Sequence, residues 1–330
     1  MMNATMKPLV SIALCTYNGS RFLREQLDSL LVQDYPQFEI VAVDDASSDD
    51  SFSILEAYAR RDQRLKLHRN PHTLGFSKNF ETVIHLCRGA LIAPCDQDDV
   101  WSPHKLSSLQ KAIGDAPMVY CDSELIDADG NSLHRHISDL RVLAPVRDPA
   151  ALVFGTCVYG HAMLFRRELL NDALPLPTGM SHDQWLSCVA ACRGTLQYCD
   201  EALVGYRQHG GALAGAVGLH NKIPDPPGHK LVSILEVLAR VDYCALHASE
   251  PNRAFFMHLS ELLRQWMHRP ACIQLPLFLA RHRARLFATF PDQQPPHFHR
   301  TSKYVWGLPI RRLIQPRQYA VAHRRAFSES

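Results

Sequence analysis

The chain has 330 residues, 46% hydrophobic and 21% charged, a globular composition that suits one large domain or one domain with an extension. The formal net charge of +2 is too small for a nucleic-acid-binding signature, so no nucleic-acid partner is expected. No apolar run approaches the roughly 20 residues that span a membrane, no signal-peptide pattern is seen, and ten cysteines lack CxxC spacing, which together predict a reduced, cytoplasmic protein.

The first 113 residues alternate between patterns typical of strands and of helices. Residues 8–18 are a near-continuous apolar run that ends in polar residues, as expected of a strand buried on both faces. Apolar residues then recur at helical spacing over 20–33, and the strand pattern returns from residue 38. Further segments predict helices over 51–62, 77–89 and 102–113, and strands over 64–70 and from residue 90. This alternation predicts a mostly parallel sheet wrapped by helices.

The second half is more mixed. The sequence predicts a strand and a turn in 117–133, one or two strands meeting a helix in 155–169, a helix in 181–194, and a strand or hairpin in 196–211. A proline-rich linker follows at about residue 220, and helical periodicity then dominates to about residue 290.

The last stretch, from residue 303, is rich in arginine and contains one acid, Glu329. Two interpretations are open. The apolar residues and the basic charge suit peripheral association with an anionic membrane surface. The stretch also suits a solvated, partly disordered tail.

Polar side chains follow three of the predicted strands. They lie at Thr16 to Asn18, at Asp44 and Asp45, and at Asp96 to Asp99. In open α/β sheets, ligands bind beyond the carboxyl ends of the strands. The sequence therefore predicts that three separate segments bring polar side chains to one edge of the sheet.

The segment "DQDD" crowds three carboxylates into four positions, and their mutual repulsion needs a cation or strong solvation. An Asp-x-Asp pair on a loop can bind a hard divalent cation and leave positions open for water and phosphates. Such a cation, Mg²⁺ or Mn²⁺, would neutralise a diphosphate leaving group. By itself the segment also suits a solvated acidic turn.

Four segments, "TYN", "VDDASSDD", "LGFSKNF" and "DQDDVW", occur in an order and at intervals that resemble the nucleotide-binding half of family-two glycosyltransferases. The resemblance covers roughly residues 8–215 and implies the GT-A fold, in which a mostly parallel, Rossmann-like sheet is flanked by helices. "DQDDVW" together with "YRQHG" is most similar to rhamnosyltransferases of surface-polysaccharide assembly. The implied organisation is a GT-A domain over 8–220, with a nucleotide-binding half (8–115) and an acceptor half (116–220), and a helical extension with a basic tail over 221–330.

The resemblance also implies roles for individual residues in the nucleotide-binding half. Asp45 would accept a hydrogen bond from the base or ribose, and Asp44 would do so instead or order its loop. Asp98 would be the principal metal ligand, and Asp96 would contact the ribose or the metal. Asp99 would not bind the metal itself but would contact the residues that do. Others would lie along the nucleotide: Thr16, Tyr17, Asn18, Lys78 and Asn79. Many relatives carry Asn where this chain has Thr73, which leaves the hydrogen bonding of that loop open.

An inverting transfer needs a base that takes the proton of the attacking hydroxyl. The resemblance assigns this role to Asp183 in "SHDQW", while the sequence alone favours a helix cap. His182 and Trp185 are expected to flank the acceptor, and Trp185 suits the core equally. Arg207 and His209 in "YRQHGG" are expected to contact the diphosphate or the metal after a glycine loop closes, or to be ordinary loop residues.

These features together predict a metal-dependent inverting glycosyltransferase. It would move a sugar from a nucleoside-diphosphate sugar to a glycan or lipid-linked acceptor. One alternative is a sugar-phosphate nucleotidyltransferase, for which "CTYNGSRF" has too few glycines. The other is a nucleotide- or glycan-binding protein that has lost catalysis, against which the acids at Asp45, Asp98 and Asp183 argue.

Overall fold

The computed structural model describes residues 7–177, 180–209, 229–268 and 273–291. The predicted basic tail and the glycines at 210 and 211 lie outside these residues.

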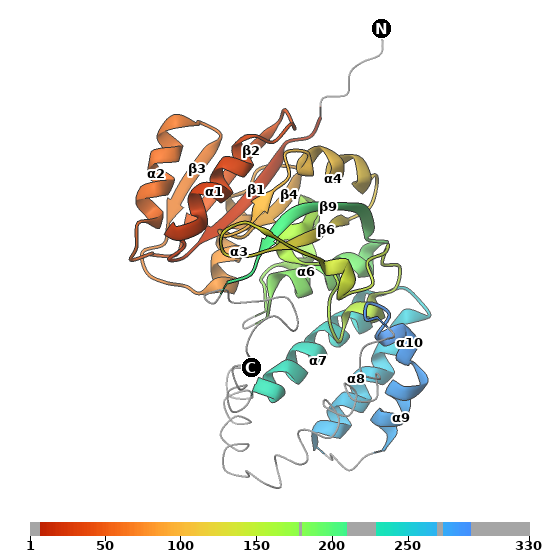
Figure 1. Cartoon of the computed structure of the whole chain (residues 1–330). Coiled ribbons are helices and arrows are strands. Elements are labelled where there is room, and N and C mark those ends of the chain that lie inside the picture. The colour runs from red at the N-terminus through yellow and green to blue at the C-terminus, as the bar shows by residue number, and fades with distance from the viewer. Residues whose placement is uncertain (1–6, 178–179, 210–228, 269–272, 292–330) are drawn as a thin grey trace. The chain divides into compact units, whose positions relative to one another are not determined.

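The first half alternates strands and helices, as predicted (Figure 1). Three long apolar strands are buried along their whole length, because helices cover both faces of the sheet. The strands are β1 (Val10–Thr16), β2 (Phe38–Asp44), β3 (Leu65–Arg69), β4 (Leu91–Cys95) and the short β5 (Val100–Trp101). The helices are α1 (Ser20–Leu31), α2 (Ser51–Arg61), α3 (Phe76–Leu86) and α4 (Lys105–Ile113).

The second half adds four strands and two helices to the same unit. They are β6 (Met118–Ile126), β7 (Ser132–His136), β8 (Met163–Arg166), α5 (Leu170–Ala173), α6 (His182–Arg193) and β9 (Gln197–Arg207). Within the described residues the strands form one nine-stranded sheet in the order β3-β2-β1-β4-β8-β6-β9-β5, with β7 beside β6. The pairs among β1 to β4 are parallel, and β8 runs antiparallel to β4 and β6. The predicted α/β fold with a mostly parallel sheet and a helical C-terminal region is confirmed.

The register of the parallel strands positions the predicted site. Val10 on β1 lies opposite Phe38 on β2 and Leu91 on β4, so the three strands begin at one edge and end at the other. Their carboxyl ends deliver the loops after Thr16, Asp44 and Cys95 to that second edge.

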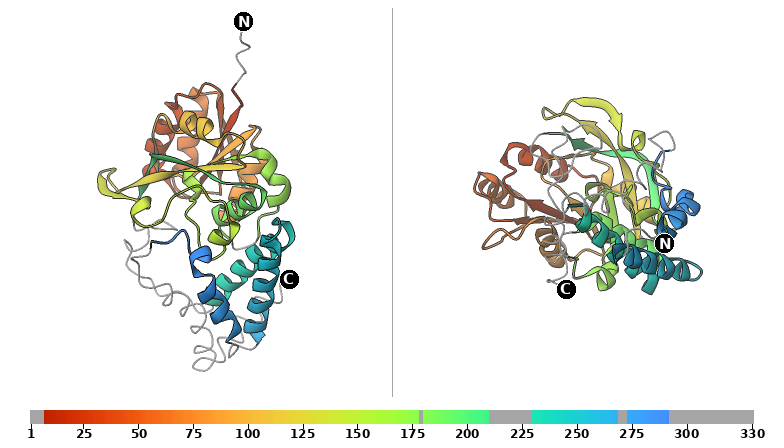
Figure 2. Two further views of the ribbon diagram at one scale, coloured as in Figure 1. Left: turned by 90° about the vertical axis from the view of Figure 1, so that its right-hand side faces the viewer. Right: turned by 90° about the horizontal axis from the view of Figure 1, so that it is seen from below.

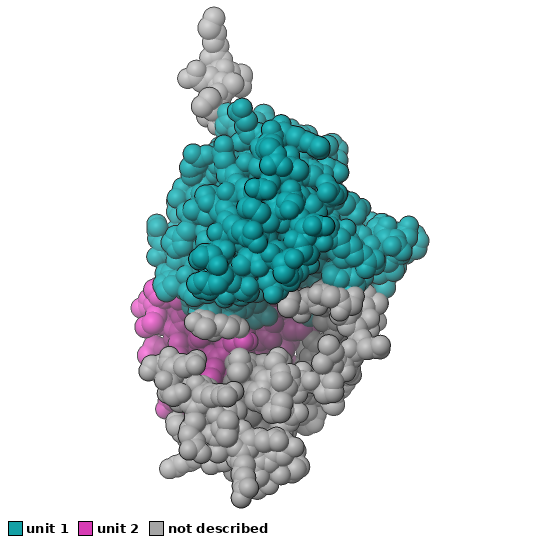
Figure 3. Space-filling model, turned by 90° about the vertical axis from the view of Figure 1, so that its left-hand side faces the viewer, with its two compact units in different colours: residues 1–147, 158–220 teal, residues 148–157, 221–330 magenta. Residues whose placement is uncertain are grey.

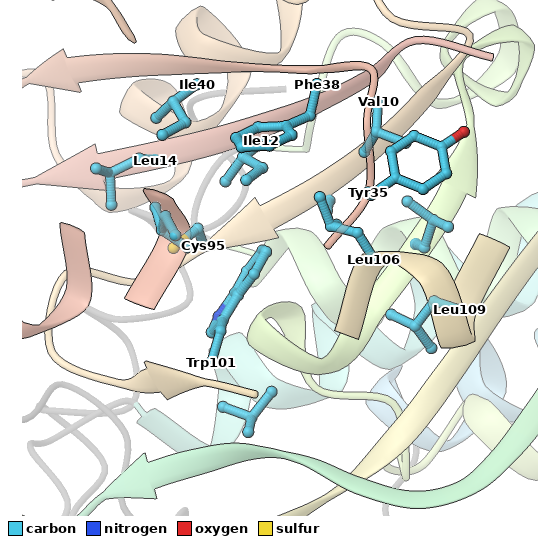
Figure 4. Close-up of a cluster of buried hydrophobic side chains, with 14 of the residues drawn as sticks. Val10, Ile12, Leu14, Tyr35, Phe38, Ile40, Cys95, Trp101, Leu106 and Leu109 are labelled. Atoms are coloured by element: carbon cyan, nitrogen blue, oxygen red, sulfur yellow. The ribbon is translucent and has the colours of Figure 1, made fainter. Parts of the chain in front are cut away.

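The core of this unit lies between the sheet and its helices. Figure 4 shows Ile12 and Leu14 of β1, Ile40 of β2, and Leu106 and Leu109 of α4 in one cluster of buried side chains. Burying such aliphatic side chains contributes about 1.5–3 kcal/mol each. The loops of the site are therefore attached to closely packed strands and helices.

The chain divides into two compact units, coloured separately in Figure 3. Residues 1–147 and 158–220 form the first, and residues 148–157 and 221–330 form the second. The second unit contains α7 (His229–His247), α8 (Asn252–His268), α9 (Gln274–Arg281) and α10 (Arg283–Leu286), of which α7 and α8 pack side by side (Figure 2). The predicted boundary at residue 220 stays a prediction; the compact units differ from it in the segment 148–157, which groups with the C-terminal helices. In the described part of the chain, no helix has the length and apolar character needed to cross a membrane.

Candidate active site

The loop after β1 carries the predicted residues Thr16, Tyr17 and Asn18. The backbone N–H of Tyr17 donates to Oε1 of Gln97 at 2.8 Å, and Nε2 of Gln97 donates back to the Tyr17 carbonyl at 3.1 Å. Oδ1 of Asn18 accepts the backbone N–H of Ser48 at 2.8 Å. The loop is thus held between the loops after β2 and β4, and the Tyr17 ring remains exposed. Gln97 was not predicted, because the middle residue of an Asp-x-Asp segment carries no distinguishing signal.

Asp44 and Asp45 are both buried and both order backbone. Asp44 accepts the hydroxyl of Thr16 at 3.1 Å and the N–H of Ser47 at 3.0 Å. Asp45 accepts Nδ2 of Asn70 at 2.7 Å and the backbone N–H groups of residues 74 and 75 at 2.8 and 2.9 Å. A carboxylate has about four acceptor positions, so Asp45 retains room for one further donor.

The loop before α3 is ordered by the same network. Oγ1 of Thr73 donates to the Asp45 carbonyl at 3.2 Å. The threonine that replaces the asparagine of many relatives therefore still ties this loop to the end of β2. Asn79 is buried and accepts Nδ2 of Asn70 at 2.9 Å, while Lys78 pairs with Glu81 at the surface. Of the two residues predicted beside the nucleotide, Asn79 is therefore buried within this hydrogen-bond network and Lys78 is the accessible one.

The acid loop, defined here as Asp96 to Asp99, follows β4. Burial and the carboxylates of Asp98 and Asp183 raise the pKa of Asp96 to about 7. Burial, Asp98 and Asp96 raise the pKa of Asp99 well above its ordinary value, and Oδ2 of Asp99 has no hydrogen-bond partner among the described residues. The predicted repulsion is therefore present, and an added positive charge would relieve it.

Two sets of donors at this loop could bind a cation. The predicted ligands Asp98 and His209 lie together, with 2.9 Å between Oδ2 and Nε2. Among the described residues, a second set is formed by Asp96, Asp99 and His161, whose donor atoms all lie within 4.8 Å of one another. Carboxylate oxygens with one imidazole suit a divalent cation, so the side chains present fit the predicted cofactor.

His161 and Lys105 are buried neighbours of the acid loop that sequence analysis missed. Nζ of Lys105 donates to the His161 carbonyl at 2.5 Å and lies 3.0 Å from the centroid of the Trp101 ring. Burial lowers the pKa of Lys105 to about 8, and burial and Lys105 lower that of His161 to about 3. Lys105 follows the acid segment by six residues, which could have pointed to it, whereas His161 is 62 residues further along the chain and no local pattern marks it.

Asp183 lies in the first turn of α6, where a carboxylate is favoured by the helix dipole. The cap residue is Ser181, so the alternative of Asp183 as the helix cap is wrong. Oδ1 of Asp183 accepts the hydroxyl of Ser181 and, at 2.7 Å, the backbone N–H of Gln184. A Cβ at Gly160, the residue before His161, would lie 3.7 Å from the Cβ of Asp183, so Asp183 lies beside the segment that carries His161.

The two side chains expected to flank the acceptor are both buried. Nε1 of Trp185 donates to the Ala173 carbonyl at 2.8 Å, so Trp185 belongs to the core, the alternative left open above. The His182 ring stacks on Phe80 with centroids 3.8 Å apart. Burial lowers the pKa of His182 to about 4. Both side chains therefore point from α6 into the core and anchor that helix.

Arg207 is 1% exposed and is directed into the protein. Its guanidinium donates to backbone carbonyls and to Glu25. These partners occupy most of the guanidinium, and the expected contact of Arg207 with a diphosphate stays a prediction. His209, two residues later, does reach the acid loop.

The site thus combines hydrogen-bonded loops after β1 and β2, a carboxylate cluster suited to a cation, and one further carboxylate on α6. Such a set can bind a diphosphate ester, stabilise a departing diphosphate and accept a proton.

Comparison with known proteins agrees with this description. Residues 11–174 match the family model Glycosyl transferase family 2. An uncharacterized glycosyltransferase of Rickettsia prowazekii is 34% identical over 212 residues, covering 61% of this chain and 64% of that protein. Another, from Haemophilus influenzae, is 25% identical over 223 residues, covering 62% and 66%. The chain therefore spans about two thirds of the length of these relatives.

Among solved structures, S. aureus TarS 1–349 in complex with UDP-GlcNAc has a TM-score of 0.57 at 17% identity, covering 90% of this chain and 81% of TarS 1–349. S. aureus TarS also has a TM-score of 0.57, at 16% identity, covering 95% of this chain and 54% of that chain. At these identities the likeness concerns the fold, and it agrees with the predicted GT-A architecture.

Proposed function

We propose that this chain, whose residues 11–174 match the Glycosyl transferase family 2 model, is a metal-dependent inverting glycosyltransferase. The donor is a nucleoside-diphosphate sugar, the class to which the UDP-GlcNAc bound by TarS belongs. The acceptor is a hydroxyl of a glycan or a lipid-linked glycan in surface-polysaccharide assembly, with a deoxyhexose such as rhamnose as one candidate sugar. A cytoplasmic location, with or without attachment of the tail to a membrane, belongs to the same proposal.

One observation carries the proposal. Loops after the parallel strands β2 and β4 bring Asp45 and Asp98 to one edge of the sheet. Asp183, in the first turn of α6, lies beside Gly160, the residue before His161. A nucleotide pocket, a diphosphate-neutralising cluster and a base are the three parts that such a transfer requires.

For the cation we retain Asp98, Asp96 and His209 as ligands. The side chains of Asp98 and His209 are 20% and 13% exposed, whereas those of Asp99 and His161 are 0% and 3% exposed. A catalytic cation keeps open positions for phosphate oxygens, and only the more exposed pair offers them. When bound, the cation would neutralise the diphosphate as it leaves.

The chain's own residues perform the remaining steps. The Tyr17 ring and the Asp45 carboxylate hold the nucleoside. Asp183 takes the proton of the acceptor hydroxyl as the oxygen attacks the anomeric carbon from the face opposite the diphosphate. Attack from the opposite face inverts the anomeric configuration.

The decisive experiment follows nucleoside diphosphate release from a panel of nucleotide sugars with Mg²⁺ or Mn²⁺ and glycan or lipid-linked acceptors. Asp183→Asn should lower kcat by about 10²–10⁴-fold, because it removes a general base. The KM for the donor should stay unchanged, because Asp183 acts on the acceptor.

Asp115→Asn, at an exposed position, is the matched control and should behave as wild type. Transfer that survives Asp183→Asn unchanged contradicts the assignment of the base. Pyrophosphate release from a nucleoside triphosphate and a sugar phosphate would indicate the nucleotidyltransferase alternative. Tight nucleotide binding without turnover of any donor would indicate a binding protein.

A further inference from the structure

Arg207 ends β9, and its guanidinium links three segments that are far apart in the sequence. Nε donates to the carbonyl of Asp98 at 2.8 Å. Nη1 donates to the carbonyls of Asp127 and Ala128 at 3.2 and 3.1 Å, and Nη2 donates to Glu25 on α1 at 2.6 Å. These bonds use four of the five N–H donors of the guanidinium, which leaves little of it for a substrate.

The backbone of Arg207 also forms a hydrogen bond with the acid loop. Its N–H donates to Oδ1 of Asp99 at 3.0 Å. Arg207 therefore fixes the main chain of Asp98 with its side chain and the carboxylate of Asp99 with its main chain. His209 follows two residues later and reaches Oδ2 of Asp98 at 2.9 Å. The distance between Asp98 and His209 thus depends on where Arg207 is held.

The turn between β6 and β7 is shaped to receive this guanidinium. Gly130 has a φ of +84°, a conformation that other residues rarely adopt. A Cβ at Gly130 would lie 3.3 Å from Oε1 of Glu25 and 3.6 Å from Nη1 of Arg207. Asp127 accepts the backbone N–H groups of Asp129 and Asn131 at 2.9 Å each, which closes the turn and leaves its carbonyls facing Arg207.

We propose that Arg207 is a positioning residue that sets the spacing of Asp98 and His209 for a divalent cation, and that it does not bind the diphosphate. The proposal rests on the proposed function only for the presence of that cation. A planar guanidinium with its donors at fixed angles can meet three segments at once, which a lysine cannot. Residues that orient metal ligands typically change metal affinity by about 10–100-fold when replaced.

The test measures Mn²⁺ binding directly, by electron paramagnetic resonance of the free ion, with full-length protein and no donor sugar. Arg207→Lys should weaken Mn²⁺ binding by about 10–100-fold. Glu25→Gln, at a half-exposed position that should tolerate the change, should weaken it by a smaller factor in the same direction. Asp98→Asn is the positive control, and Arg193→Lys, whose ion pair with Asp172 is on the far end of α6, is the matched negative control.

Raising the Mn²⁺ concentration should restore turnover to Arg207→Lys with an unchanged KM for the donor. Wild-type Mn²⁺ affinity in folded Arg207→Lys and Glu25→Gln would overturn the proposal, as would absence of Mn²⁺ binding by the wild type. A raised donor KM at saturating Mn²⁺ would instead identify Arg207 as a diphosphate ligand. Because binding is measured without a sugar donor, a protein that binds Mn²⁺ and transfers nothing contradicts only the proposed function.

Discussion

His182 is buried beside the proposed base, and neither of its ring nitrogens has a hydrogen-bond partner among the described residues. Its ring stacks on Phe80, and a Cβ on Gly160 would lie only 2.5 Å from its Nε2. The imidazole therefore acts as a packed aromatic ring, and burial keeps it neutral by lowering its pKa from 6.5 to about 4. A histidine whose pKa is lower in the folded state than in the unfolded state makes the free energy of unfolding depend on pH.

Because the pKa of His182 is lowered by folding, His182→Phe should change the pH dependence of stability. Between pH 6.5 and about 4 the unfolded chain binds a proton at His182 that the folded chain does not, so wild-type stability falls as the pH falls. Phenylalanine has no such proton. The Tm of His182→Phe minus that of wild type should therefore be more positive at pH 5 than at pH 7.5, whatever constant offset the larger ring adds.

His85→Phe, at an exposed position on α3, is the control and should show no such change between the two pH values. An equal Tm difference at pH 5 and pH 7.5 for His182→Phe would mean that His182 is protonated or solvated in the folded protein.

At the scale of elements, the amino ends of the parallel strands are joined by a buried carboxylate, at the edge opposite the site. Glu39 on β2 accepts the hydroxyl of Ser11 on β1 at 2.7 Å and the N–H of Arg88 before β4 at 2.9 Å. The Arg88 guanidinium also pairs with it at 2.9 Å. Burial alone would raise the pKa of Glu39, but these hydrogen bonds hold it below 4.5.

Glu39→Gln should lower the free energy of unfolding at pH 7 by about 1–3 kcal/mol, because it removes charge-assisted hydrogen bonds from a buried position. Since the folded-state pKa is lowered, the contribution of Glu39 is present above pH 4.5 and is lost as the pH falls below it. Urea unfolding should thus show a deficit at pH 7 that narrows toward pH 3.5. Glu56→Gln, on the exposed face of α2, should match wild type, and a deficit independent of pH would contradict the account.

At the scale of the whole molecule, the segment 148–157 belongs to the helical unit although it interrupts the first unit in sequence. Asp148 pairs with Arg285 at 2.5 Å, and the Val153 carbonyl accepts the guanidinium of Arg240 at 3.0 Å. Leu152 and Val153 are fully buried, and Phe154 nearly so. A cut at residue 220 separates this apolar segment from the helices of its own unit.

We therefore expect residues 1–220, expressed alone, to bind a hydrophobic dye and to aggregate at concentrations where the full chain does not. The exposed apolar side chains supply the driving force. Replacing Leu152, Val153 and Phe154 by serine in the fragment should restore a monomer, as judged by light scattering. A monomeric, dye-silent fragment without these changes would show that the predicted boundary at residue 220 also separates two self-sufficient parts.

Hydrophobic periodicity was enough to predict the α/β fold and the loops that form the site. Continuous apolar runs followed by helical spacing predict a parallel sheet, and parallel strands carry the residues after them to one edge. The loop after Asp44 and the loop that contains Asp98 were therefore predictable from periodicity alone. The order of four short segments added the resemblance to a glycosyltransferase family.

The contacts of each side chain in the site became known from the three-dimensional structure. Arg207 points inward to Asp98, Asp127 and Glu25, and Gln97 pairs with the backbone of Tyr17, across separations of 80 or more residues. Such pairings depend on how loops from distant parts of the chain approach one another, and no local pattern records that approach. Burial also separates the roles of residues of one type. An exposed aspartate or histidine can bind a ligand, whereas a buried one holds neighbouring loops in place.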